Sequence, residues 1–202
     1  MIADVFIKLH IYLANFFTAD ECNQIIDTNA DNLEEGTVNG NDTLEGQKAV
    51  LKLRKSKVKF LTLDSPCGYL LKKMADRVKD LAEIYYQTYL SSFEAIQLAE
   101  YNKNNFYNWH TDATGAIDSH IQRDISASLI LSKKSDYTGG SLQFVVPEKI
   151  SDSNIITPKD VEEQGQGTLI MFPSTLIHRV DKVLSGTRHS LVLWSRSTYK
   201  PY

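Results

Sequence analysis

The chain has 202 residues, of which 42% are hydrophobic and 23% charged, a composition typical of one folded globular domain that needs no disulfide or structural metal. The net charge of −3 gives no overall attraction to nucleic acid or to an anionic membrane. No leader-like apolar segment opens the sequence, and no apolar run approaches the ~18 residues of a membrane span. We therefore expect a cytoplasmic protein with no membrane partner, and nothing in the charge favours nucleic acid as a partner.

The first predicted element is a strand over Val5–Phe17, which is rich in β-branched and aromatic residues. Thr18 and Glu21 have the spacing of a capping box, so a helix should follow and run to about Ala30. The apolar side of this helix should be formed by Cys22, Ile25 and Ile26. Cys22 and the second cysteine, Cys67, form no CxxC pair and are expected to be buried free thiols.

A basic segment comes next, because five of the eight residues of Lys52–Lys59 are Lys or Arg. Two interpretations of this extended segment remain open. In the first it is an edge strand whose lysines discourage aggregation. In the second it is an attractive wall for an acidic substrate.

A long amphipathic helix is predicted after the basic segment. Ser65 and Pro66 suit the N-cap and the first helical position. Apolar residues then recur at intervals of three and four, the pattern of a helix with one buried side. This stripe consists of Leu71, Met74, Val78, Leu81 and Tyr85.

From about residue 95 the pattern changes to short strands separated by turn residues, which is typical of a β-sandwich or barrel. The predicted strands are Ala95–Tyr101, Ile125–Ser132, Ser141–Val146, Thr168–Phe172, His178–Leu184 and His189–Ser197. Since helices precede most strands, we expect the helices to cover one face of the sandwich. The chain is thus predicted to be a single domain over 1–202, with helical support in 1–94 and the core in 95–202.

Two polar stretches show little apolar pattern, at 31–47 and 147–165. Both are long for simple connections, so we expect loops that are mobile and border a substrate entrance.

One group of residues points to metal chemistry. His110 and Asp112 are two residues apart, so on an extended segment both side chains lie on one face and can bind one ion. His178, at the start of a later predicted strand, can supply a third ligand. Two histidines and a carboxylate form a facial triad, which leaves coordination positions open and suits Fe(II) oxygen chemistry.

Arg188 follows His178 by ten residues. Strand alternation gives it the same face as Ser190, Val192 and Trp194. An arginine directed into an apolar sandwich is costly unless it is paired, and the strand offers no acidic partner. A dicarboxylate ligand would supply one, because guanidinium binds carboxylate in a bidentate manner.

The order and spacing of these residues resemble the prolyl 4-hydroxylase branch of the 2-oxoglutarate oxygenases. The motifs that carry the resemblance are Phe16-Phe17-Thr18-Ala19-Asp20-Glu21-Cys22, Tyr101-x5-Tyr107-x2-His110-x-Asp112, Gly139-Gly140-Ser141-Leu142, Gly167-Thr168-Leu169-Ile170-Met171-Phe172-Pro173, and His178 with Arg188. They extend over nearly the whole chain. The resemblance implies an α+β fold: a double-stranded β-helix (jelly-roll) sandwich with N-terminal helices packed on one face.

The resemblance also implies roles for single residues. His110, Asp112 and His178 match the iron ligands of the family. Arg188 matches the basic residue that binds the distal carboxylate of 2-oxoglutarate, and is accordingly the arginine variant of that position.

Three further positions match residues around the cosubstrate. Tyr101 corresponds to a tyrosine whose hydroxyl reaches 2-oxoglutarate, Trp194 to a tryptophan near the cosubstrate and substrate pocket, and Ser190 to the serine of an Arg-x-Ser pattern. Asn104 departs from the family, which often has glycine there. Asparagine tolerates the left-handed conformation, so the turn can be kept.

The activity that the resemblance implies is hydroxylation of a substrate C–H bond with Fe(II), 2-oxoglutarate and O₂, giving succinate and CO₂, with ascorbate as a reductant. Three hypotheses remain open. The first is hydroxylation of proline in a peptide or protein. The second is the same chemistry on a free amino acid, another small molecule or a nucleic-acid base. The third, a metal-binding sandwich without catalysis, is disfavoured by the presence of Arg188 beside the full ligand set.

Overall fold

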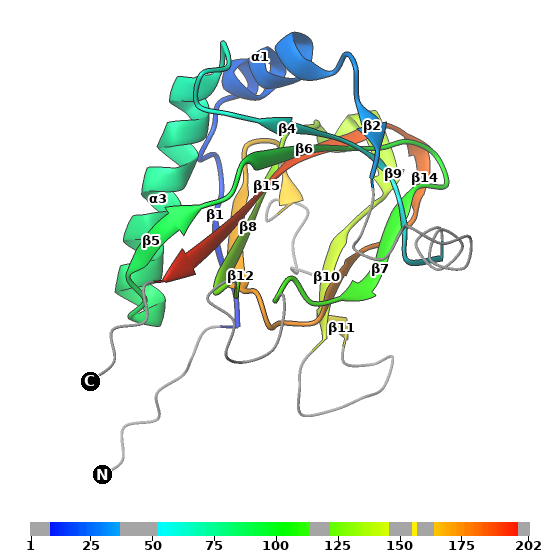
Figure 1. Cartoon of the computed structure of the whole chain (residues 1–202). Coiled ribbons are helices and arrows are strands. Elements are labelled where there is room, and N and C mark those ends of the chain that lie inside the picture. Colours follow the sequence, from blue (N-terminus) through cyan, green and yellow to red (C-terminus); the bar gives the residue numbers. More distant parts are fainter. Residues whose placement is uncertain (1–8, 37–51, 114–121, 146–154, 157–163, 198–202) are drawn as a thin grey trace.

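The computed structural model describes residues 9–36, 52–113, 122–145, 155–156 and 164–197 (Figure 1). Its larger sheet has eight strands, in the order β1-β12-β8-β15-β6-β4-β2, with β5 paired to β15 off this path. The bounds of these strands are β1 Ile11–Leu13, β2 Glu34–Glu35, β4 Lys57–Leu61, β5 Leu90–Phe93, β6 Ile96–Tyr101, β8 Ile125–Ile130, β12 Leu169–Pro173 and β15 Arg188–Ser197. Strands from before and after residue 94 therefore form one sheet.

A smaller sheet of five strands, in the order β11-β10-β13-β7-β3, lies opposite the larger one (Figure 1). Its strands are β3 Arg54–Lys55, β7 Phe106–His110, β10 Leu142–Val145, β11 Ile155–Ile156 and β13 His178–Val180. A separate pair joins β9 Tyr137–Gly139 to β14 Val183–Gly186, and the 3-10 helix η1 spans Lys134–Asp136. The strand predicted over His178–Leu184 is thus two strands, because the chain leaves β7 and β10 after Val180 and then pairs with β9.

The helices α1 Ala19–Asn29 and α3 Gly68–Tyr86 pack on one face of the larger sheet (Figure 1). The hydrophobic cluster on that face joins helix residues such as Met74 and Val78 to Leu191 and Leu193 of β15. A second cluster fills the space between the sheets and includes Ala99, Tyr101, Ile130, Phe144, Ile170 and Phe172. The expected jelly-roll sandwich with N-terminal helices on one face is confirmed.

The predicted strand over Val5–Phe17 is too long within the described residues. Only Ile11–Leu13 pair with β12, and Asn15 has a φ of 54°, a left-handed conformation that ends the strand. The capping box of α1 is confirmed: the Thr18 N–H donates to Glu21 Oε2 (2.8 Å) and the Glu21 N–H donates to Thr18 Oγ1 (3.2 Å).

The prediction that Ser65 and Pro66 begin α3 is wrong. The helix begins at Gly68, after a turn in which the Gly68 N–H donates to the Ser65 carbonyl oxygen (2.8 Å). A β-carbon at Gly68 would lie 1.8 Å from the Leu63 carbonyl oxygen, so only glycine fits this turn. Of the predicted stripe, Tyr85 is 44% exposed, and the buried members are Leu71, Met74, Val78 and Leu81.

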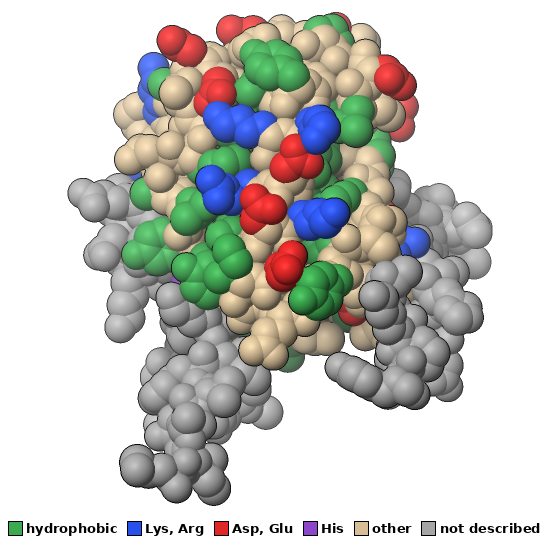
Figure 2. Space-filling view, turned by 90° about the vertical axis from the view of Figure 1, so that its left-hand side faces the viewer, with side chains coloured by type: hydrophobic (Ala, Val, Ile, Leu, Met, Phe, Trp, Pro, Cys, Tyr) green, Lys and Arg blue, Asp and Glu red, His purple; other side chains and the backbone are tan. Residues whose placement is uncertain are grey.

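Figure 2 shows the side of the molecule on which α3 lies in Figure 1. Cationic and anionic side chains are mixed over this side, with hydrophobic ones between them. Lys72 pairs with Asp76 and Lys73 with Glu21, each at 2.6 Å. No broad area of one charge sign is visible on this face, in keeping with the small net charge.

The basic segment Lys52–Lys59 forms two strands in two different sheets. β3 is at the end of the smaller sheet, whereas β4 lies inside the larger sheet between β6 and β2. Lys55 is exposed, Lys59 pairs with Asp31 (3.3 Å), and Arg54 is only 4% exposed. The edge-strand interpretation therefore suits β3 and its exposed lysine, while the burial of Arg54 needs another explanation.

The two predicted loops lie largely outside the described residues. The described pieces include β2, which pairs with β4, and β11, which pairs with β10. Mobility of these loops and their place at a substrate entrance stay predictions. Cys22 and Cys67 are buried and free, as expected. None of the helices in the described ranges has the length and apolar character to cross a membrane.

Candidate metal and cosubstrate site

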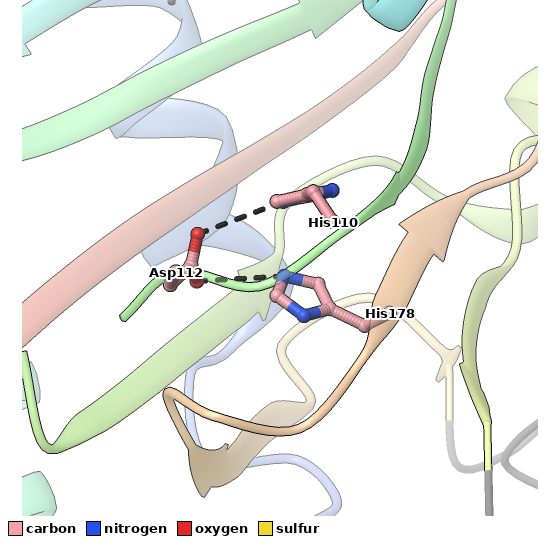
Figure 3. Close-up of side chains that lie close together, drawn as sticks. All are labelled: His110, Asp112 and His178. Carbon is pink, nitrogen blue, oxygen red and sulfur yellow. Dashed lines mark ion pairs between the residues drawn. The ribbon is translucent and has the colours of Figure 1, made fainter. Parts of the chain in front are cut away.

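The structure brings His110, Asp112 and His178 together between the two sheets (Figure 3). One ligand atom from each residue can be chosen so that all lie within 4.8 Å of one another. His110 ends β7, Asp112 follows it by two residues, and His178 begins β13. The carboxylate of Asp112 lies between the imidazoles, 3.6 Å from His110 Nε2 and 3.4 Å from His178 Nε2.

Strand pairing fixes the two histidines. His178 lies directly opposite His110 in the β13–β7 register, and Val180 lies opposite Tyr107, so the register shifts between these pairs. The shift is a bulge in β7, a feature that often redirects side chains beside functional sites. After the strand, the Asp112 and Ala113 N–H groups donate to the Ser174 carbonyl oxygen (2.9 and 3.0 Å), which anchors the carboxylate segment.

Each imidazole is oriented by a backbone carbonyl. His110 Nδ1 lies 2.7 Å from the Asn108 oxygen, and His178 Nδ1 lies 2.8 Å from the Leu176 oxygen. A carbonyl can only accept, so Nδ1 of a neutral ring carries the hydrogen and Nε2 keeps its lone pair. Both Nε2 atoms are directed at Asp112 (Figure 3), the arrangement that metal-binding histidines adopt.

The protonation states suit metal ligands. Burial disfavours the ionised form of Asp112, but the attraction of the His110 and His178 side chains outweighs burial and holds the pKa of the carboxyl well below its usual value. Burial lowers the pKa of His110, and the charge of His178 lowers it further against the attraction of Asp112. An ionised carboxylate and a neutral imidazole are the forms that coordinate a cation.

Two serines that sequence reasoning missed support the carboxylate. Ser126 Oγ donates to Asp112 Oδ2 (2.8 Å) and also lies 2.8 Å from Ser174 Oγ. Ser126 and Ser174 are fully buried. A sequence clue existed for Ser126, which lies in the apolar segment Ile125–Ile130, because a buried hydroxyl requires a partner.

Arg188 lies in the same interior and is 1% exposed. Its Nη1 donates to Ser190 Oγ (2.9 Å), whereas its buried Nε and Nη2 have no hydrogen-bond partner among the described residues. Gly140 makes room for it: a β-carbon there would lie 3.1 Å from Arg188 Cδ and 2.9 Å from Val183 Cγ2. Gly140 and Gly139 both have positive φ, a conformation that glycine adopts without steric cost.

The other predicted site residues also face this interior. Tyr101 lies opposite Arg188 in the β6–β15 register, and the guanidinium carbon is 5.6 Å from the centre of its ring. Trp194 lies opposite Ser126 on β8, the serine that supports Asp112. The Trp194 Nε1 is buried without a partner in the described ranges. Asn104 has a φ of 66°, so it keeps the left-handed turn.

Arg123, which is outside the predicted set, lies against Trp194. The Arg123 guanidinium lies 3.9 Å from the centre of the indole ring and binds Glu94 through Nε (2.8 Å) and Nη2 (2.6 Å). Arg196 binds the same carboxylate at 2.7 Å. Burial opposes ionisation of Glu94, but both guanidinium groups outweigh it and lower its pKa. Nothing in the local sequence pattern marks this group.

The residues fit a divalent metal with a dicarboxylate beside it. Two imidazole Nε2 atoms and one carboxylate converge on a small volume, which is the donor set of a facial triad. Arg188 presents two unmatched N–H groups in the same interior, and a carboxylate would accept both. Such a site can hold a metal with open coordination positions and orient an anionic ligand next to it.

Comparisons with known proteins agree with this chemistry. The family model described as "2OG-Fe(II) oxygenase superfamily" matches residues 96–196. A PKHD-type hydroxylase of a Synechococcus species is 31% identical over 105 residues, which are 51% of this chain and 43% of that protein. One from a Picosynechococcus species is 35% identical over 99 residues, 49% of this chain and 40% of that protein. The aligned segment thus spans less than half the length of these relatives.

Solved structures resemble the whole fold. A Pseudomonas putida prolyl-4-hydroxylase superposes with a TM-score of 0.69 at 19% identity, covering 95% of this chain and 94% of that one. A Trichoplax adhaerens prolyl hydroxylase, solved with a hypoxia inducible factor peptide fragment, also gives 0.69 at 15% identity, covering 94% of this chain and 84% of that one. At these identities the likeness establishes the fold alone.

Proposed function

We propose a function on the premise that this chain belongs to the 2OG-Fe(II) oxygenase superfamily, whose family model matches residues 96–196 of the 202. Membership implies Fe(II) as the cofactor, with 2-oxoglutarate and O₂ as cosubstrates. In our assignment His110, Asp112 and His178 hold the iron, and Arg188 holds the cosubstrate. The observation that carries it is the combination of a preformed ligand cluster with an arginine that lacks partners for two buried N–H groups.

The chain's own residues orient the reactants. The guanidinium of Arg188 binds the distal carboxylate of 2-oxoglutarate, so the keto acid can approach the metal in only one direction. Ser190 holds one arm of that guanidinium, and the Tyr101 hydroxyl donates to the same cosubstrate. Trp194 forms a wall of the pocket on the Asp112 side.

When bound together, Fe(II), 2-oxoglutarate and O₂ supply an oxidative decarboxylation that yields succinate and CO₂ and puts one oxygen atom on a substrate carbon. The protein contributes a buried interior that contains the Arg188 guanidinium and keeps this chemistry on the substrate. We include ascorbate as the reductant that keeps the metal in the ferrous state between turnovers.

The substrate that we propose is a proline residue in an extended peptide or protein segment. Support comes from the curated relatives, which are named PKHD-type hydroxylases, and from the prolyl hydroxylase titles of the similar folds. A physical argument points the same way: a proline-rich segment is already stiff in a polyproline II conformation, so it binds a groove at low entropic cost. The cytoplasm is the proposed compartment.

The alternative is the same chemistry on a free amino acid, another small molecule or a nucleic-acid base. One experiment decides between them. The purified chain is incubated with Fe(II), 2-oxoglutarate and ascorbate, in separate reactions, with proline-containing peptides, matched peptides in which alanine replaces proline, free amino acids and oligonucleotides. We expect mass spectrometry to find one added oxygen on the proline peptides alone, with equal succinate. A gain of oxygen on another substrate, and none on any peptide, would overturn the prolyl assignment.

A further inference from the structure

Arg54 is a buried charge that the proposed function leaves unused. It lies in β3 and is 4% exposed, yet it takes part in none of the ion pairs formed within the described ranges. Its hydrogen bonds go to neutral oxygens, from Nε to Ser56 Oγ and from Nη2 to Gln97 Oε1, both at 2.7 Å. A buried cation kept without an acidic partner calls for a specific role.

Arg54 links the two sheets. Its own strand pairs with β7 of the smaller sheet, where it lies opposite Tyr107. Gln97 belongs to β6 of the larger sheet, and Ser56 lies at the crossing from β3 to β4. Because the guanidinium is planar, contacts in both directions fix its plane as well as its position.

The guanidinium plane stacks on the Tyr107 ring, which stacks in turn on the His110 ring of the metal cluster. We call this stack of three side chains the column. The Arg54 guanidinium carbon lies 4.7 Å from the centre of the Tyr107 ring. The Tyr107 ring in turn lies 3.5 Å from the His110 ring, at an angle of only 11°.

Backbone geometry prepares this column. Alternation along a regular strand would put Tyr107 and His110 on opposite faces, because they are three residues apart. The bulge in β7, seen as a register shift against β13, brings both rings to one face. Gly36 closes the far side: a β-carbon there would lie 2.6 Å from Ser56 Oγ and 2.9 Å from Arg54 Nε.

We propose that Arg54 is a positioning residue, which holds the Tyr107 ring against His110 and so fixes the orientation of that imidazole for metal binding. The Asn108 carbonyl restrains His110 at the ring edge, and Tyr107 restrains it at the ring face. This inference rests on the proposed function only in requiring that the cluster binds a divalent metal.

The test measures metal affinity without turnover, by electron paramagnetic resonance titration with Mn(II), which accepts the same nitrogen and oxygen ligands as Fe(II). We expect Arg54→Met to weaken Mn(II) binding roughly 10–100-fold, the usual effect of losing a residue that orients a metal ligand. Tyr107→Leu should do the same. Tyr107→Phe keeps the ring and should keep wild-type affinity. Gly36→Ala changes no charge, yet should weaken binding in the same direction by displacing Ser56 and Arg54.

Two controls separate positioning from general effects. Lys55→Met removes a charge from the neighbouring, exposed position of the same strand and should leave Mn(II) affinity unchanged. Val78→Ala opens a cavity in the cluster beneath α3, away from the metal site, and supplies a variant of lowered thermal stability. If Arg54→Met binds Mn(II) as wild type does, or no more weakly than Val78→Ala at equal stability, the positioning role is overturned. If the wild type itself binds no Mn(II) or Fe(II), the proposed function fails and the inference with it.

Discussion

Asp112 and Arg188 are buried charges of opposite sign in one interior, and their surroundings differ in kind. The carboxylate of Asp112 contacts both histidines and accepts from Ser126. Arg188 donates from Nη1 to Ser190, while its Nε and Nη2 have no partner among the described residues. The metal ligand is thus fully supported by protein atoms, and the cosubstrate arginine is only partly satisfied.

This difference shows that the metal-binding half of the site, around Asp112, is already formed without a ligand. The cosubstrate-binding half, around Arg188, depends on a ligand to complete its hydrogen bonds. A buried N–H without an acceptor costs roughly 1–3 kcal/mol, and more when it belongs to a charged group such as guanidinium. Such a cost is tolerated where a bound carboxylate removes it. The carboxylate of Asp112, by contrast, accepts a hydrogen bond from Ser126, and the neighbouring histidines keep its pKa low before any metal arrives.

The largest expected effect comes from removing a ligand of the metal-binding half of the site. His178→Ala removes one of the two imidazole nitrogens that would bind the metal. It also removes a neighbour that favours the ionised form of Asp112. Succinate formation should therefore fall to the level of a reaction without enzyme. Circular dichroism should show the same fold, because His178 lies at the start of a short strand. Near-wild-type turnover in this variant would mean that the ligand assignment is wrong.

Replacing Arg188, in the cosubstrate-binding half, should weaken the binding of 2-oxoglutarate more than it lowers the stability of the fold. Arg188→Met removes a charge-assisted pair that contributes about 1.5–3 kcal/mol to binding, so the KM for 2-oxoglutarate should rise roughly 10–100-fold. Without ligand the variant should unfold at no lower a temperature than wild type, because unmatched buried N–H groups are removed. Saturating 2-oxoglutarate with Mn(II) should stabilise wild type much more than the variant. Equal stabilisation of both proteins would contradict the role of Arg188.

Local sequence rules predicted the parts of this site that depend on one strand or one helix end. Period-two alternation along β15 correctly separated Arg188 and Ser190 from Leu191 and Leu193, because the strand lies centrally between β8 and β6. The capping box of α1 was predictable for the same reason, since both partners lie within one turn.

What the sequence could not predict depends on contacts between distant segments. Ser126 and Ser174 are 48 residues apart, and Arg54 and Gln97 are 43 apart, so no local pattern links them. The start of α3 was predicted wrongly because it is set by a turn in which the Leu63 carbonyl leaves no room for a β-carbon at Gly68. No side chain caps this end of the helix. The bulge in β7 leaves no mark in the residue pattern, although it determines where Tyr107 points.

A smaller effect should follow from weakening the support of Asp112. Ser126→Ala removes the hydrogen bond to Oδ2, and we expect Mn(II) affinity to fall about 10-fold, at the lower end for a residue that supports a metal ligand. Ser128→Ala is the matched control, since Ser128 is also buried and lies two residues along the same strand. Titration of both variants should separate them, and equal affinities would remove Ser126 from the metal site.

The smallest effect concerns His189, which lies beside Arg188 on the opposite face of β15. Burial lowers the pKa of His189 below its ordinary value of 6.5, and the charge of Arg188 lowers it further, against the attraction of Glu100 at 3.2 Å. The unfolded chain therefore binds more protons than the folded chain as the pH falls below about 6.5, so the neutral imidazole contributes stability above that pH that is lost in acid.

His189→Gln cannot titrate, so its free energy of unfolding should fall less steeply between about pH 6.5 and pH 5 than that of wild type. Denaturant unfolding at several pH values measures this slope. Arg188→Met should also flatten it, because removing the neighbouring positive charge raises the pKa of His189 toward the unfolded value. If the pH dependence of the free energy of unfolding were unchanged in both variants, the charge of Arg188 would not affect the pKa of His189. The buried charge of Arg188 would then destabilise the protein only through its contacts on the interior face of β15.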